Sequence, residues 1–338
     1  MPRNSFAPLA VAFVRRHPSH YALAALALAM TGWAASGGLA DPARADEPRT
    51  APRSGAMAGP LPGIVQPRVV PALSSASATG AASPSVTETG LRTAGTGVAP
   101  DQILSRQLAP VVAATPASLS VAVLDPADGR AARYGVRAGT TYDTASIVKV
   151  DILAALLLQA QDQHRELTAQ EKESASLMIR ISDNASANAL WRVIGEAPGL
   201  NAANRRLGLT GTTGGSDGHW GLTQTTATDQ LALLTSVFGT DSPLDAASRT
   251  YLRSLMGGIE AGQDWGVSAA GPATGLKNGW LQRTATGRWD VNSIGLVRVD
   301  GHDRLVAVLS RGNVTMADGV TLVEKAAKAA VQALGTTA

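Results

Sequence analysis

The stretch YDTASIVKVDILAALLLQ, residues 142–159, decides how the fold is built. From Ala145 to Leu158 it is apolar almost all round, which is typical of a helix buried on most sides. Lys149 nevertheless follows Ser146 by one turn, in what we expect to be the first turn of that helix. A buried ammonium group is costly unless it is partnered, and burial lowers the pKa of a lysine toward the range in which it acts as a base. The stretch therefore predicts a buried helix whose Ser–Lys pair carries chemistry.

Strand and helix patterns on either side of this stretch predict an α+β fold. Strand patterns occur near both ends of the folded part, at Ser118–Asp125, Ala131–Val136, Ala273–Leu281, Trp289–Val299 and Arg304–Arg311. Further helical patterns occur at Ala99–Ala114, Thr168–Ile179, Ala185–Ile194, 199–206, 227–238, 244–256 and Gly319–Leu334. We therefore expect an antiparallel sheet built from both chain ends and covered by the terminal helices, with an inserted all-helical lobe.

The first 100 residues have a different composition and predict two separate segments. Residues 1–45 combine arginines, an uncharged stretch at 21–40 and small-residue sites, which is the order of a secretory signal peptide cleaved after Ala45, or after Ala40 as the second choice. A retained N-terminal anchor is the alternative, since about 20 uncharged residues can just span a bilayer. Residues 46–100 are dominated by Ala, Pro, Ser, Thr and Gly and predict a disordered spacer. Residues 101–338 are then the folded domain, and we expect it to be secreted or extracytoplasmic.

Charge and residue types exclude several classes of function. Residues 1–100 hold eight Lys/Arg against four Asp/Glu, whereas residues 101–338 hold 21 against 22. The folded part is thus close to neutral, which argues against nucleic-acid binding. Without cysteine, and with scattered histidines, the sequence offers no disulfide framework, no lipid-attachment cysteine and no zinc motif. It also lacks a phosphate-binding glycine motif, so we expect neither a metal nor a nucleotide cofactor.

Three short motifs carry the candidate chemistry. They are Ser146-Ile147-Val148-Lys149 at the start of the apolar helix, Ser182-Asp183-Asn184 in a break between helices, and Lys277-Asn278-Gly279-Trp280 on a late strand. Each motif alone is common, as a helix cap, a turn or a solvated bend. Their order, spacing and structural context together are specific. Ser and Lys three apart on a helix share one face, so a lysine with a lowered pKa can take the proton of the hydroxyl group.

This set of motifs resembles the penicillin-recognising serine hydrolases, above all the class A β-lactamases and the related D,D-peptidases. The resemblance covers the whole folded part and implies their fold, with an acyl-enzyme formed on Ser146 and Lys149 as its proton acceptor. It implies that Ser182 relays a proton to the leaving amine and that Asn184 holds the substrate amide and Lys149. It also implies substrate binding by Lys277, Asn278, Gly279 and Trp280: Lys277 attracts the substrate carboxylate, and the backbone N–H groups of Ser146 and Trp280 form the oxyanion hole. Trp280 and Trp220 are candidates for lining the cleft.

At two positions the sequence departs from the family pattern, which limits the residue roles that the resemblance implies. Asn278 stands where a hydroxyl residue is usual, and we expect its amide to donate a hydrogen bond in its place. No glutamate occurs between Glu196 and Glu260, where the family carries the residue that activates the deacylating water. The loop at 212–223 offers only Asp217 and His219, and whether either replaces that glutamate stays open. Acylation is therefore expected to be efficient, with slow or unconventional deacylation.

The expected activity is that of an exported serine hydrolase acting on a β-lactam or a D-alanyl peptide, with peptidoglycan as a further partner. A D,D-peptidase or penicillin-binding relative, or a non-catalytic protein that binds cell-wall peptides, is the alternative. Gly214–Gly218 also has the form of a Gly-x-Ser-x-Gly nucleophile elbow, but it lacks the strand before and the helix after that an α/β-hydrolase requires. Arg283 and Arg288 are candidates for assisting the substrate carboxylate. We expect a monomer.

Overall fold

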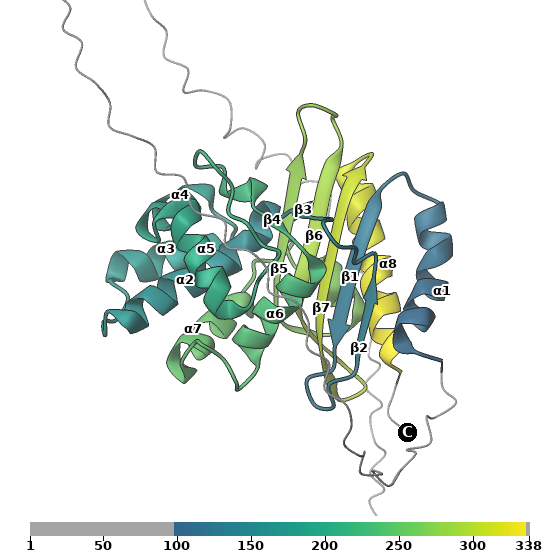
Figure 1. Ribbon diagram of the computed structural model, residues 1–338, viewed down its shortest axis with the longest axis horizontal. Coiled ribbons are helices and arrows are strands. Elements are labelled where there is room, and N and C mark those ends of the chain that lie inside the picture. Colours follow the sequence, from purple (N-terminus) through teal and green to yellow (C-terminus); the bar gives the residue numbers. More distant parts are fainter. Residues whose placement is uncertain (1–97, 336–338) are drawn as a thin grey trace, which may run out of the picture. The chain divides into compact units, whose positions relative to one another are not determined.

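A five-stranded antiparallel sheet with helices against both faces organises residues 98–335, which are the residues that the computed structural model describes (Figure 1). The strands are β1 (Ser118–Leu124), β2 (Ala131–Tyr134), β5 (Ala273–Gln282), β6 (Trp289–Val299) and β7 (His302–Asn313), in the order β2-β1-β7-β6-β5. Two short strands, β3 (Tyr142–Asp143) and β4 (Gln224–Thr225), form a separate pair. The signal peptide predicted at residues 1–45, and the spacer at 46–100 apart from its last three residues, lie outside the described residues.

The helices fall into two groups. The terminal helices α1 (Pro100–Ala113) and α8 (Met316–Leu334) cover one face of the sheet (Figure 1). The chain between β3 and β5 contains the others, which are α2 (Val148–Asp162), α3 (Ala169–Arg180), α4 (Asn184–Val193), α5 (Glu196–Leu207), α6 (Ala227–Phe238) and α7 (Ala246–Met256). The described residues also form three short 3₁₀ helices, η1 (Ala145–Ile147), η2 (Trp220–Leu222) and η3 (Gly266–Ala270). Within residues 98–335, none of the helices is both long and apolar enough to cross a bilayer.

Pairing of β1 with β7 joins the two ends of the domain, as the sequence predicts. Val121 of β1 lies opposite Val308 of β7. Alternate residues of β7 enter two different apolar clusters, because successive side chains of a strand point to opposite faces. Val306 and Val308 pack with α1 and α8, whereas Leu305 and Leu309 pack with the helical lobe. The α+β prediction is thus confirmed, including the sheet built from both chain ends.

Helix α2 lies at the centre of the helical lobe. All residues from Ile147 to Leu158 are buried, which confirms the prediction from its almost uniform apolarity. Ser146, however, does not lie inside the α-helix, because the chain enters α2 through the 3₁₀ turn η1. The next helix, α3, begins with a capping box between Thr168 and Glu171.

Candidate active site

Ser146 lies in the middle of η1, on a backbone held in an unusual conformation. The preceding residue, Ala145, has a φ of +47°, in the left-handed region that non-glycine residues rarely adopt. Ser146 is partly exposed, whereas Ala145 and Ile147 on either side of it are buried. Such conformations cost free energy and are concentrated at functional sites. The turn therefore presents one hydroxyl group to solvent from an otherwise buried segment.

Gly279 allows the edge strand β5 to pass against this turn. A Cβ atom at Gly279 would lie 2.7 Å from the backbone nitrogen of Ser146, and 2.8 Å from both the nitrogen of Ile147 and the oxygen of Thr144. These are backbone atoms that cannot move aside independently, so a larger residue would push the strand and the turn apart. The glycine of the Lys-Asn-Gly motif is thus explained by this close approach.

Lys149 is fully buried, with an exposed fraction of 0%, and its amine faces the break between α3 and α4. Its Nζ lies 2.6 Å from the backbone oxygen of Ser182, 3.1 Å from Ser182 Oγ and 2.9 Å from Asn184 Oδ1. Ser182 itself has a φ of +59°, and Asp183 accepts a hydrogen bond from the backbone of Ser186 and so caps α4. The Ser-Asp-Asn motif therefore ends one helix, starts the next and turns two side chains toward Lys149.

A second buried lysine reaches the same hydroxyl group from the sheet. Lys277 Nζ lies 3.1 Å from Ser182 Oγ and 3.1 Å from the backbone oxygen of Asn278. Burial, together with the nearby charge of Lys277, lowers the pKa of Lys149 well below its ordinary value, against the opposing effect of Asp183. Burial lowers the pKa of Lys277 to about 7. The three motifs thus meet at Ser182, between two amines that are readily deprotonated.

These contacts fit Lys149 in either protonation state. The charged amine donates to the backbone oxygen of Ser182, to Ser182 Oγ and to Asn184 Oδ1. A neutral amine keeps two donors, and its lone pair can then accept the hydroxyl hydrogen of Ser182. Ser182 Oγ can then accept a hydrogen bond from Lys277. No hydrogen bond in the described part of the chain joins Ser146 Oγ to Lys149 Nζ, so the hydroxyl bonded to this amine is that of Ser182.

The side chains of Asn278 and Trp280 lie away from this meeting point. Asn278 Nδ2 donates to the backbone oxygens of Gln263 at 2.8 Å and Trp265 at 2.9 Å, and Asn278 Oδ1 is buried without a hydrogen-bond partner among residues 98–335. The Trp280 ring packs against Trp265, with ring centroids 5.9 Å apart. Strand alternation explains this arrangement, because Lys277 and Gly279 share the opposite face of β5. The amide donors expected to meet the substrate carboxylate are therefore already engaged by the loop before η3.

The loop at 212–223 brings an aromatic ring over Lys149. The Trp220 ring centroid lies 4.8 Å from Lys149 Nζ, and Trp220 Nε1 donates to Asn188 Oδ1 of α4 at 2.7 Å. The backbone beyond Trp220 contacts the serine turn, because Thr144 N donates to the backbone oxygen of Thr223 at 2.9 Å. Trp220, one of the two tryptophans named from the sequence as candidates for lining the cleft, thus lies beside Lys149. Its contact with Asn188 could not be foreseen, because it joins two separate elements.

The two titratable residues of this loop are exposed. Asp217 accepts a hydrogen bond from Ser216 at 2.9 Å, and the His219 ring lies 3.3 Å from the backbone oxygen of Ser216. Neither makes a described contact with Ser146 or Lys149. The alternative elbow around Ser216 is not flanked by a strand and a helix, and the main sheet is antiparallel, so the rejection of an α/β-hydrolase is confirmed.

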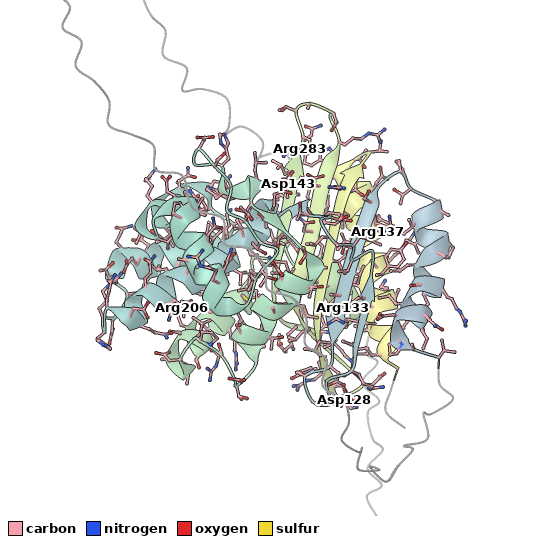
Figure 2. The ribbon with its side chains drawn as sticks, viewed as in Figure 1. Asp128, Arg133, Arg137, Asp143, Arg206 and Arg283 are labelled. Carbon is pink, nitrogen blue, oxygen red and sulfur yellow. The ribbon has the colours of Figure 1, made fainter. Side chains whose placement is uncertain are left out.

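Arg283, proposed from the sequence to assist a carboxylate, is paired within the protein. It follows β5, and its guanidinium group lies 2.6 Å from Asp143 Oδ2 of β3, three residues before Ser146 (Figure 2). Asp143 also accepts a hydrogen bond from Gln224 of β4. Arg283 therefore ties the β5–β6 connection to the strand that leads into the serine turn.

Two solved β-lactamases share the fold of this chain. A class A β-lactamase from Bacteroides cellulosilyticus matches with a TM-score of 0.61 and 18% identity, covering 71% of this chain and 100% of that one. A β-lactamase from Streptosporangium roseum matches with a TM-score of 0.57 and 20% identity, covering 70% and 98%. At these identities the likeness shows the fold alone.

Sequence comparison gives a curated relative and a family. The relative is a candidate lipoprotein, LppW, from Mycobacterium tuberculosis, 30% identical over 185 residues that make up 52% of this chain and 58% of that protein. This chain thus spans less than two thirds of that relative's length. The profile of the beta-lactamase enzyme family, Beta-lactamase2, matches residues 166–334, which include Ser182, Asn184 and Lys277 but begin after Ser146 and Lys149. Because this match covers half of the chain and agrees with the fold, the protein belongs to the beta-lactamase enzyme family.

Proposed function

We propose that this protein is an exported serine hydrolase that forms an acyl-enzyme on Ser146 with a β-lactam or a related amide and then hydrolyses it slowly. One observation carries the proposal. Two buried lysines, Lys149 and Lys277, meet at Ser182 Oγ at 3.1 Å each, beside a turn that exposes Ser146. Burying two amines without a carboxylate partner is unfavourable for stability, and such perturbed groups are concentrated at functional sites.

Acylation involves three proton transfers in this proposal. Ser146 Oγ attacks the carbonyl carbon of the substrate while its proton passes to the neutral Lys149. The carbon–nitrogen bond of the substrate then breaks, and the leaving nitrogen takes a proton from Ser182, which is replenished from Lys149 through their 3.1 Å contact. The backbone N–H groups of Ser146 and Trp280 stabilise the oxyanion, and each such donor lowers the barrier by about 3 kcal/mol.

Deacylation is slow in this proposal because, in the part of the chain that the structure describes, no carboxylate is bonded to Ser146 or Lys149 to activate water. The residues that could have replaced the family's loop glutamate, Asp217 and His219, are exposed and contact Ser216. The side of Lys149 that faces this loop is covered by the ring of Trp220.

A penicillin-binding or D,D-peptidase role, or binding of cell-wall peptides without catalysis, is the second candidate. This candidate is favoured because the polar groups expected to hold the carboxylate of a β-lactam already bind other groups of the protein. The N–H donors of Asn278 are taken by backbone carbonyls, and the guanidinium group of Arg283 is paired with Asp143.

We further propose an extracytoplasmic location. Support comes from the curated relative, whose name describes a candidate lipoprotein, and from the signal-like composition of residues 1–45. The sequence contains no cysteine, so a lipid attached through cysteine is not part of this proposal.

Intact-mass measurement with benzylpenicillin tests the proposal. The protein is expected to gain the mass of one penicillin within minutes and to keep it for hours, because attack is assisted and deacylation is not. Ser146→Ala is expected to show no gain, whereas Ser216→Ala, which alters the exposed serine of the alternative motif, is expected to label like the wild type. Rapid turnover without an adduct would contradict slow deacylation, and absence of both adduct and turnover would favour the binding role.

Replacing Trp220 is expected to move the pH dependence of acylation. In Trp220→Ala, water reaches Lys149 and the pKa of its amine rises, because burial is the main cause of its lowered value. Less of the amine is then neutral at pH 7, and the acid limb of the acylation rate shifts to higher pH. Trp220→Phe keeps a ring over the amine and serves as the matched control, with a smaller shift. Measured pH–rate profiles that coincide for the three proteins would contradict this role of the ring.

A further inference from the structure

Asn292 is a polar residue in the middle of the sheet, and the roles proposed above do not use it. It lies on β6 with an exposed fraction of 0%. Two and four residues further along the strand, Ile294 and Leu296 pack with the helical lobe, whereas Val291 packs on the opposite face. By strand alternation the side chain of Asn292 points to the side of the sheet on which Ser146 lies. A buried amide at this position needs a partner for each of its polar atoms.

The partners of Asn292 are the carbonyl groups that lead into the serine turn. Its Nδ2 donates to the backbone oxygen of Asp143 at 2.8 Å and to that of Thr144 at 3.1 Å. Its Oδ1 accepts a hydrogen bond from the backbone nitrogen of Ser310 on β7 at 3.1 Å. Both N–H donors and the acceptor are therefore engaged, and the side chain links the centre of the sheet to the two residues before Ala145.

This link holds a turn that would otherwise relax. The left-handed conformation of Ala145 costs free energy, and such strain persists only where the surroundings fix it. Gly279 lies opposite Asn292 in the β5–β6 pairing. Gly279 lets the turn approach the sheet, and Asn292 binds the turn at that place. The loop at 212–223 also holds this turn, because Thr144 N donates to the backbone oxygen of Thr223.

We infer that Asn292 is a positioning residue for acylation, which sets where the backbone nitrogen of Ser146 lies relative to β5. The inference rests on the proposed function of Ser146. Both N–H groups of the proposed oxyanion hole depend on this distance, because Ser146 lies in the turn and Trp280 lies on β5. Displacement of about 1 Å in such a site can lower a rate about 100-fold.

A comparison of Asn292→Ala with Asn313→Ala tests this inference. Asn313 is a matched control, because it is 1% exposed, lies in the same sheet and also donates from Nδ2 to two acceptors, Trp289 O and Ser310 Oγ, at 2.9 Å each. Both variants are expected to lose similar thermal stability. Asn292→Ala alone is expected to slow acylation of Ser146 at least tenfold, with an unchanged dissociation constant for the penicillin before acylation. Asn292→Asp removes the two N–H donors with little change of shape, and it replaces the alanine variant if that variant does not fold.

Amide hydrogen exchange provides a second measurement that needs no reaction. The amides of Thr144 and Ile147 are expected to exchange at least tenfold faster in Asn292→Ala than in Asn313→Ala. Equal exchange of these amides in the two variants would overturn the inference whatever the acylation rates. Absence of labelling in the wild type would overturn the proposed function, while the exchange experiment would still decide the role of Asn292.

Discussion

Lys149→Met is expected to lower the acylation rate of Ser146 by about 10²–10⁴-fold, the usual contribution of a general base. Methionine is close in length and apolar, so it fills the buried space while removing the amine that contacts Ser182 and Asn184. Lys277 still reaches Ser182 Oγ, so the loss isolates the contribution of Lys149 as base. Stopped-flow or mass-resolved acylation by benzylpenicillin measures the effect.

The matched control for this prediction is Lys172→Met. Lys172 is half exposed on α3 and pairs with Glu166 at 3.0 Å, which is an interaction of little consequence for stability. Its replacement is expected to leave acylation unchanged. An acylation rate of Lys149→Met within threefold of the wild type, in a folded protein, would remove Lys149 from the proposed mechanism.

Asp151→Asn is expected to stabilise the protein above neutral pH by several kcal/mol. Asp151 lies two residues after Lys149 in α2 and is fully buried. Burial, and then the nearby charge of Asp229, raises the pKa of the carboxyl group of Asp151 to about 8 from an ordinary 3.8. The Asn204 amide, with its nitrogen turned to Asp151, lies 2.9 and 3.0 Å from the two carboxyl oxygens and only partly offsets this effect.

The sign of the pH dependence follows from proton binding. Between pH 4 and pH 8 the folded protein keeps a proton on Asp151 that the unfolded chain has lost, so the free energy of unfolding falls as pH rises through this window. Below pH 4 the group has no effect, and above pH 8 its cost is complete, at most about 6 kcal/mol. Asparagine cannot ionise, so the variant lacks this dependence and gains most at pH 8 and above.

Urea unfolding of both proteins at pH 5, 7 and 9 checks this expectation. Asp162→Asn is the matched control, because Asp162 ends the same helix in an exposed pair with Arg206 and its removal should change stability by less than about 1 kcal/mol at each pH. A difference between Asp151→Asn and the wild type that stays constant from pH 5 to pH 9 would show that Asp151 does not bind a proton on folding.

Most of the fold could be predicted because its signals are local. The alternation in the sequence of β1, the uniform apolarity of α2 and the capping box at Thr168 each act between residues that are near neighbours in the chain. The same signals missed the two-residue strands β3 and β4, which are too short to show a period. The 3₁₀ entry into α2 was also missed, because the contact with Gly279 shapes this turn.

The sequence alone determined which residue types could react. Ser146, Lys149, Ser182, Asn184 and Lys277 were all named from motif order, and the structure brings the last four together. The sequence did not reveal that the N–H donors of Asn278 bind a neighbouring loop. An asparagine at that position has the same local sequence pattern whether its amide faces the substrate or the loop.

Which of these groups meet depends on the packing of distant elements. Ser182 and Lys277 are 95 residues apart in the chain, and their contact depends on how the helical lobe packs against β5. The ring of Trp220 over Lys149 and the bonds from Asn292 to the serine turn likewise join elements with no periodic relation in sequence. Local sequence patterns fix helices, strands and caps because the forces behind them act over a few residues. Contacts between such elements depend instead on the packing of the whole domain.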